Sequence, residues 1–131
     1  MKTGYMLIDE HELIGIEFRF GGREPNDALD CYGLMMCMYR WRGIELPDYL
    51  SPSDGPTVSQ LVTSGLKLWS KTNEEIDGNM CVFQVADYLH VGYCLGDGWF
   101  VHTWEGSGGV TIEELDDWRG RLVGVYSYVG K

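Results

Sequence analysis

The most informative stretch of this sequence is Leu29-Asp30-Cys31-Tyr32-Gly33-Leu34. Asp30 is a typical helix N-cap, and the apolar residues behind it repeat at helical spacing until Gly43 offers a stop. The sequence therefore predicts a helix that begins at Cys31. Unpaired amides and the helix dipole at that position favour an anion, so we expect the pKa of the Cys31 thiol to fall and a thiolate to form.

The other three cysteines are interpreted as packing residues. Cys37 lies among the methionines of the predicted helix, and Cys81 and Cys94 lie in apolar runs with strand character. No C-x-x-C pair or H-E-x-x-H run occurs, so neither a metal site nor a cofactor is expected. Few cysteines for the chain length and no recognisable signal peptide also give no reason to expect disulfides.

Two histidines flank the strongest hairpin signal, in which two apolar runs are joined by Gly96-Asp97-Gly98. A plain two-residue turn would place His90 and His102 on opposite faces of the hairpin. A three-residue loop, or a two-residue turn with a bulge, would place them on one face, with Gly92 opposite His102. We predict the odd-length connection.

That hairpin would supply Cys31 with a base. His90 would take the thiol proton, and His102 would orient the ring of His90 through its far nitrogen, as in serine and cysteine triads. The backbone NH of Cys31 would contribute to an oxyanion hole. The alternative is that either histidine only caps or packs, a role that also fits His11 on its charged stretch.

Further segments surround the cysteine and the two histidines. In chain order the segments are Gly15-Ile16-Glu17-Phe18-Arg19-Phe20-Gly21-Gly22, Asp30-Cys31-Tyr32-Gly33-Leu34, Gly43-Ile44-Glu45-Leu46-Pro47, His90-Val91-Gly92-Tyr93, Leu95-Gly96-Asp97-Gly98 and Phe100-Val101-His102. Their order and spacing resemble the NlpC family of cell-wall cysteine peptidases, which share a papain-like core. The resemblance covers about residues 13–128. It implies that Cys31 is the nucleophile, His90 the base and His102 the third polar residue.

The resemblance also implies a substrate and partners. Members of the family typically cleave the peptide stems of peptidoglycan, often at the bond that follows D-glutamate. The tyrosine after the cysteine and the segment 43–47 resemble the branch found in phage tail assembly proteins, which implies phage tail proteins as partners. Two departures stand out: the usual proline-tyrosine pair is Glu17-Phe18, and the usual Gly-Asp is Gly78-Asn79. No cell-wall-binding repeat is recognised, so targeting would come from a partner or a larger assembly.

Residues that border the expected thiolate are the candidates for substrate binding. Trp104 lies two residues past His102 on the same predicted face, where an aromatic wall would hold a peptide stem, although core packing is the alternative. The predicted substrate-binding residues are Phe18, Asp30, Tyr32, Gly33 and Trp104.

The order of predicted elements favours an α+β domain. Helices come first and strands follow, which indicates N-terminal helices packed on a central antiparallel sheet in one domain over residues 1–131. This agrees with a papain-like, NlpC-type arrangement. Helices are predicted at 9–14, from Cys31 onward and at 57–70, and strands at 80–85, 90–95, 99–104 and 122–128. The acidic run 113–117 is interpreted as the solvated face of a helix, with an interaction patch as the alternative.

Charge and hydropathy restrict the partners. The formal net charge is −10 and the basic residues are scattered, which argues against nucleic acid. No apolar run approaches the length that a bilayer span requires. We therefore expect a protein that is cytoplasmic as made. It would reach the cell wall by release, in a phage tail or through a secretion device.

Three functions fit this sequence. The first is a thiol hydrolase, an endopeptidase or amidase, that forms an acyl-enzyme at Cys31 and hydrolyses it with water activated at His90. The second is a structural tail-assembly or adaptor module that uses its groove for protein binding. The third is an acyltransferase or deamidase with the same triad, because substrate choice depends on the groove rather than on the fold.

Overall fold

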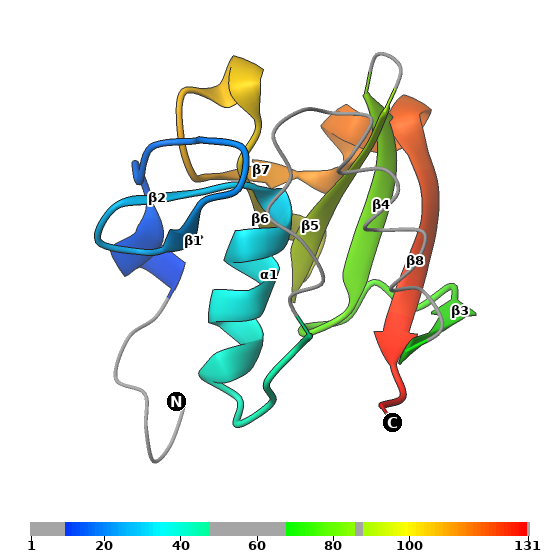
Figure 1. The fold of residues 1–131 in the computed structure, drawn as a ribbon. Helices are drawn as coiled ribbons and strands as arrows, with labels where there is room; N and C mark the ends of the chain where they lie inside the picture. The colour runs from blue at the N-terminus through cyan, green and yellow to red at the C-terminus, as the bar shows by residue number, and fades with distance from the viewer. Residues whose placement is uncertain (1–9, 48–67, 86–87, 131) are drawn as a thin grey trace.

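The computed structural model describes residues 10–47, 68–85 and 88–130. Within these ranges the protein has an α+β fold in which one α-helix packs on a six-stranded antiparallel sheet, which confirms the predicted fold class (Figure 1). The elements are η1 (Glu10–Leu13), β1 (Arg23–Glu24), β2 (Ala28–Leu29), α1 (Cys31–Arg40), β3 (Trp69–Thr72), β4 (Met80–Val85), β5 (Tyr88–Gly96), β6 (Trp99–His102), η3 (Glu105–Ser107), β7 (Thr111–Glu114), η4 (Leu115–Arg121) and β8 (Leu122–Tyr128).

The strands of the large sheet follow the order β3-β8-β4-β5-β6-β7, and each neighbouring pair is antiparallel. β4 and β5 therefore lie at the centre of the sheet. β1 and β2 form a separate two-stranded hairpin that leads directly into α1. In Figure 1, α1 lies against one face of the large sheet, with the small hairpin beside its first turn.

The start of α1 follows the local chemistry of its first residues. Asp30 is the N-cap in extended conformation, and its side chain accepts a hydrogen bond from the backbone NH of Gly33. The cap satisfies one of the amides that a helix start leaves unpaired. The helix ends at Arg40, and Gly43 with a φ of 83° turns the chain away. The predicted start at Cys31 is confirmed.

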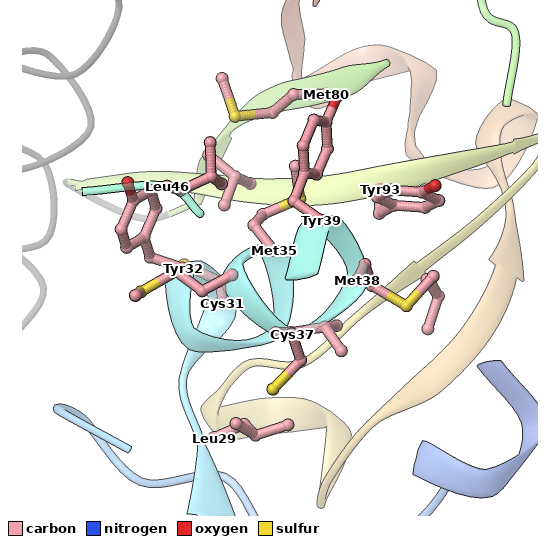
Figure 2. Packing of buried hydrophobic residues seen from close by; sticks show 14 of the residues in the cluster. Leu29, Cys31, Tyr32, Met35, Cys37, Met38, Tyr39, Leu46, Met80 and Tyr93 are labelled. Atoms are coloured by element: carbon pink, nitrogen blue, oxygen red, sulfur yellow. The ribbon is translucent and has the colours of Figure 1, made fainter. Parts of the chain in front are cut away.

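Two buried clusters occupy the two faces of the sheet. The α1 side chains pack with Met80, Tyr93 and Leu46 in the first cluster, where Figure 2 shows Cys31 on the first turn of the helix. The second cluster lies on the opposite face and contains Phe83 and its apolar neighbours, covered by η4. Side chains along β4 and β5 alternate between these clusters, as the pleat of a strand requires.

The structure corrects several predicted element boundaries. Strands 80–85 and 122–128 are confirmed, while the hairpin strands run over 88–96 and 99–102, and the first helix is the 3-10 turn η1. Residues 57–67 of the predicted third helix lie outside the described residues. Its predicted end is wrong, because Trp69 belongs to β3 and packs on Tyr39 and Tyr128. The acidic run begins in β7 rather than in a helix. The two edge strands, β3 and β7, form because they pair with neighbouring strands, and the local sequence alone does not predict them.

Candidate active site

The β5–β6 hairpin places both histidines on one face. Tyr93 pairs with Val101 and Gly96 pairs with Trp99, and the register shifts between Cys94 and Gly96. Asp97 and Gly98 both have left-handed backbone conformations, as a type I′ turn requires. The connection is therefore the two-residue turn with a bulge. It produces the shared face that the sequence predicted for the odd-length connection.

His90 and His102 form a buried imidazole pair. The Nε2 atom of His90 lies 2.8 Å from the Nδ1 atom of His102. The two residues are only 1% and 0% exposed, and the His90 ring packs on Phe83 and Trp118. The predicted contact, in which His102 holds the far nitrogen of His90, is present.

Glu113 of β7 continues this chain of hydrogen bonds. Its Oε2 atom lies 2.9 Å from the Nε2 atom of His102, and its Oε1 atom accepts a 3.0 Å hydrogen bond from the indole NH of Trp118. A carboxylate only accepts, so His102 carries its proton on Nε2 and accepts at Nδ1 from the Nε2–H of His90. The Nδ1 atom of His90 is then the unprotonated nitrogen, the form that a general base needs.

Burial keeps both imidazoles neutral. Desolvation lowers the pKa of His90 well below its usual value, and the neighbouring His102 lowers it further. Burial also lowers the pKa of His102, although the hydrogen bond to Glu113 opposes this effect. Burial disfavours the ionised form of Glu113, but hydrogen bonds from Trp118 and His102 outweigh it and lower the pKa of the carboxyl group. The resting site therefore holds two neutral imidazoles and one carboxylate.

Folding stability should fall as the pH drops below about 6.5, the usual histidine pKa. Both imidazoles have a lowered pKa in the folded state, so the unfolded chain binds more protons at low pH and is stabilised relative to the folded state. Each histidine should contribute a slope of about 1.4 kcal/mol per pH unit. Urea unfolding between about pH 5 and 7 measures the slope. His90→Gln should reduce it, and an unchanged slope in that variant would contradict the assignment.

Cys31 is 4% exposed, and its thiol is not activated in this state. Burial, followed by the charge of Asp30, raises the pKa of Cys31 to about 12, while the backbone amides of Val91 and Tyr32 and the charge of Arg23 lower it only in part. The predicted fall in pKa is therefore wrong. The amides do point at the sulfur, but the loss of water and the capping carboxylate outweigh them.

Alkylation of Cys31 by iodoacetamide should be slow in the folded protein. A pKa of about 12 leaves the thiol protonated at pH 8, so the rate should be on the order of a thousand-fold below that of an exposed cysteine with a pKa of about 8.5. Peptide mapping by mass spectrometry across a pH series measures it. Labelling of Cys31 at the rate of a free thiol below pH 8 would show that the thiolate forms.

The Cys31 thiol contacts the backbone next to His90 rather than the His90 side chain. The sulfur lies against the amide of Val91, the residue that follows His90 in β5. Cys31 packs in the same cluster as Val91, whose side chain alternates with that of His90. No hydrogen bond within the described part of the chain joins the thiol to the imidazole. Their direct contact stays a prediction.

Three of the predicted substrate-binding residues are engaged inside the fold. The carboxylate of Asp30 accepts from the amides of Gly33 and Gly21 and from the guanidinium of Arg23, at 2.8, 2.9 and 2.8 Å. The hydroxyl of Tyr32 donates to the Pro47 carbonyl at 2.6 Å. Asp30, Tyr32 and Gly33 are thus buried and held at the start of α1, and substrate binding by these three residues stays a prediction.

Phe18 and Trp104 retain partial exposure. The Phe18 ring packs edge-on against Phe20 at 4.9 Å, and Trp104 packs edge-on against Trp118 at 5.6 Å. The indole nitrogen of Trp104 is buried and has no hydrogen-bond partner among the described residues. Substrate binding by these two side chains stays a prediction.

Sequence reasoning missed the roles of Glu113 and Trp118. Glu113 belongs to the run interpreted as a solvated acidic helix, and Trp118 directly follows that run, yet Glu113 faces His102 across the β6–β7 pairing. Apolar and polar residues alternate from Val110 to Glu113, which is a strand signal, but the alternation is too short to outweigh the acidic composition of the run that follows.

Neither a metal-binding cluster nor a membrane-spanning helix occurs in the described part of the chain. No group of three or more His, Cys, Asp or Glu side chains there could hold a metal ion. No helix in those ranges is both long and apolar enough to cross a bilayer.

The chain is similar to known proteins both in sequence profile and in fold. The sequence profile of the NlpC/P60 family matches residues 15–127. No curated protein matches the chain.

Solved structures share the fold at low sequence identity. A lipoprotein-like NLP/P60 family protein from Staphylococcus aureus subsp. aureus Mu50 is 21% identical, with a TM-score of 0.69 over 93% of this chain and 39% of its own. The NlpC/p60 domain of the peptidoglycan hydrolase SagA is 17% identical, with a TM-score of 0.63 over 90% and 92% of the two chains. NlpC2 from Trichomonas vaginalis is 16% identical, with a TM-score of 0.65 over 90% of this chain and 45% of its own. This chain thus spans less than half of the staphylococcal protein.

Proposed function

Because the chain belongs to the NlpC/P60 family, we propose that it is a cysteine hydrolase that cleaves the peptide stems of bacterial peptidoglycan. Cys31 is the nucleophile, His90 the base and His102 the orienting residue in this proposal. The observation that carries it is the hydrogen-bonded chain from His90 through His102 to Glu113, which leaves one nitrogen of His90 free to accept a proton.

The reaction begins from a neutral thiol and a neutral imidazole. The Cys31 proton moves to the Nδ1 atom of His90 as the sulfur attacks the amide carbonyl, since neither group is ionised in the free protein. This transfer requires the thiol and the imidazole, which share no hydrogen bond in the free protein, to come within hydrogen-bond distance in the substrate complex. The backbone NH of Cys31 stabilises the oxyanion.

The proton on His90 then leaves with the amine. Collapse of the tetrahedral intermediate breaks the C–N bond, and the leaving amine takes the proton, which leaves a thioester on Cys31. His90 next removes a proton from water as the oxygen attacks the thioester. The C–S bond then breaks, the acid product departs, and His90 returns the proton to the sulfur, which restores the thiol. His102 and Glu113 hold the His90 ring in the same tautomer through both halves of the cycle.

The family resemblance suggests the γ-D-glutamyl bond as the scissile bond. The resemblance of Tyr32 and the segment 43–47 to the phage tail branch supports an association with tail proteins. In that setting the protein is made in the cytoplasm and reaches the wall in a tail or after release.

A digest of purified peptidoglycan tests the proposal. Incubation with the protein should release soluble stem fragments, and mass spectrometry should assign the new termini to the bond after D-glutamate. A mock preparation from cells that lack the protein is the blank. Fragments no different from the blank would overturn the hydrolase proposal, whereas cleavage at another amide would change only the proposed bond.

Glu113→Gln should reduce kcat about 100-fold or more. Glutamine offers one acceptor oxygen where Glu113 now accepts from both Trp118 and His102. The amide NH₂ group of the glutamine then donates to His102, which favours the His102 tautomer with an unprotonated Nε2. The tautomers of both histidines reverse as a result, and His90 carries its proton on Nδ1, where it cannot act as a base. Steady-state digestion of a soluble stem peptide measures kcat. Glu114→Gln, an exposed neighbour, is the matched control, and equal rates in the two variants would contradict the role of Glu113.

A binding module on the same fold is the second candidate. The observation that favours it is the closed thiol, which is 4% exposed and has a raised pKa. Such a module would bind a stem peptide or a tail protein without turnover. The digest separates the two candidates, because the module would release no fragments.

A further inference from the structure

Two cysteines outside the proposed site lie in direct contact across the centre of the sheet. The sulfur atoms of Cys81 in β4 and Cys94 in β5 are 2.8 Å apart. Both residues are free thiols and completely buried. The proposed reaction at Cys31 uses neither of them.

The register explains why the two side chains meet. Cys81 pairs with Gly92, and Cys94 donates its amide to the Asn79 carbonyl at 2.8 Å, so the cysteines are diagonal neighbours on one face. The S–S separation exceeds the bond length of about 2.05 Å by roughly 0.8 Å, a difference that small side-chain rotations can close.

We propose that Cys81 and Cys94 are an oxidation site that closes to an intramolecular disulfide when the protein meets a small-molecule disulfide such as oxidised glutathione. One cysteine, as a thiolate, attacks the external disulfide and expels one glutathione thiolate, which forms a mixed disulfide. The other cysteine loses its proton, attacks the protein sulfur of that mixed disulfide and expels the second glutathione. Two protein thiols are oxidised, and one glutathione disulfide is reduced to two thiols.

The reaction needs the sheet to open or to be still forming. The hydrogen bond with Cys94 and then burial raise the pKa of Cys81, so the closed sheet disfavours the Cys81 thiolate. Exchange therefore proceeds during folding or when β4 and β5 separate locally. Peptidoglycan lies in compartments where disulfides persist, so the proposed place of action would favour the oxidised form. This proposal revises the absence of disulfides expected from the sequence.

A variant that carries only this pair tests the site. In Cys31→Ala/Cys37→Ala, Cys81 and Cys94 are the two remaining thiols of the chain. The variant is unfolded and refolded in excess oxidised glutathione with some reduced glutathione, then denatured in iodoacetamide and weighed intact. We expect no alkylated cysteine and a mass two hydrogens below that of the reduced chain. Two alkylated cysteines, or glutathione adducts that never resolve, would overturn the proposal.

A melting comparison checks that the bond forms in the native register. The oxidised protein should melt on the order of 10 °C above the reduced protein, because the bond closes a short loop in the unfolded chain. Adding Cys94→Ala should abolish the difference. An equal or lower melting temperature after oxidation would show that the bond is incompatible with the native sheet. Because these variants lack the proposed nucleophile, failure of the hydrolase proposal leaves this test unaffected.

Discussion

Cys31→Ala is expected to reduce the release of stem fragments at least about 10⁴-fold, to the level of the blank. The methyl group provides no nucleophile, so no thioester forms. His90, His102 and Glu113 would remain hydrogen-bonded to one another, because none of their described hydrogen bonds involves Cys31. Digestion followed by mass spectrometry and urea unfolding of the same preparations measure both effects.

The fold should survive this substitution. Cys31 is buried against the first turn of α1, and loss of its sulfur leaves a small cavity that should destabilise the protein by about 1 kcal/mol. The matched control is Cys37→Ala, which removes a second buried sulfur from the same helix. We expect the control to lose similar stability and to keep its activity. Wild-type turnover in Cys31→Ala, or equal inactivation of both variants, would exclude Cys31 as the nucleophile.

The features that the sequence predicted correctly are local ones. The start of α1 follows from Asp30 and the residues within one turn of it, and the hairpin follows from a glycine-rich turn between two apolar runs. Each depends on interactions between residues close in the sequence. His90 and His102 lie on the two strands of one hairpin, so their shared face could also be predicted from the sequence when a bulge beside the turn was considered.

The features that were missed depend on distant contacts. β3 forms because Trp69 can pack beside Tyr128, which lies near the C-terminus and far from Trp69 in the sequence. Glu113 becomes part of the site only because β7 pairs with β6. The pKa of Cys31 was predicted in the wrong direction because a helix start is a local property, whereas desolvation depends on everything packed around the thiol.

Gly33→Ala is expected to destabilise the protein by about 3 kcal/mol or more, and to reduce turnover with it. A Cβ atom at Gly33 would overlap the backbone carbonyl oxygen of Gly22, which lies beside the first turn of α1. That carbonyl cannot move aside freely, because it accepts hydrogen bonds from the amide of Asp30 at 3.2 Å and from Arg23 at 2.9 Å. Urea unfolding measures the loss.

The steric effect outweighs helix propensity at this position. Alanine is favoured over glycine in a helix by about 1 kcal/mol, so propensity alone would predict a more stable protein. Relief of the overlap must instead move the backbone of Gly22 or of the first helical turn, and the latter carries Cys31 and the hydrogen bond from Gly33 to Asp30. Cys31, the proposed nucleophile, would thus shift by a distance that reduces the rate even in the folded fraction.

Gly120→Ala is the matched control, because a Cβ atom at Gly120 meets no atom within 4 Å. Its stability should stay within about 0.5 kcal/mol of the parent, and its turnover should be unchanged. A Gly33→Ala protein as stable as the Gly120→Ala protein would show that the hairpin can withdraw from the helix. In that case the close approach of the two backbones would not fix the position of Cys31.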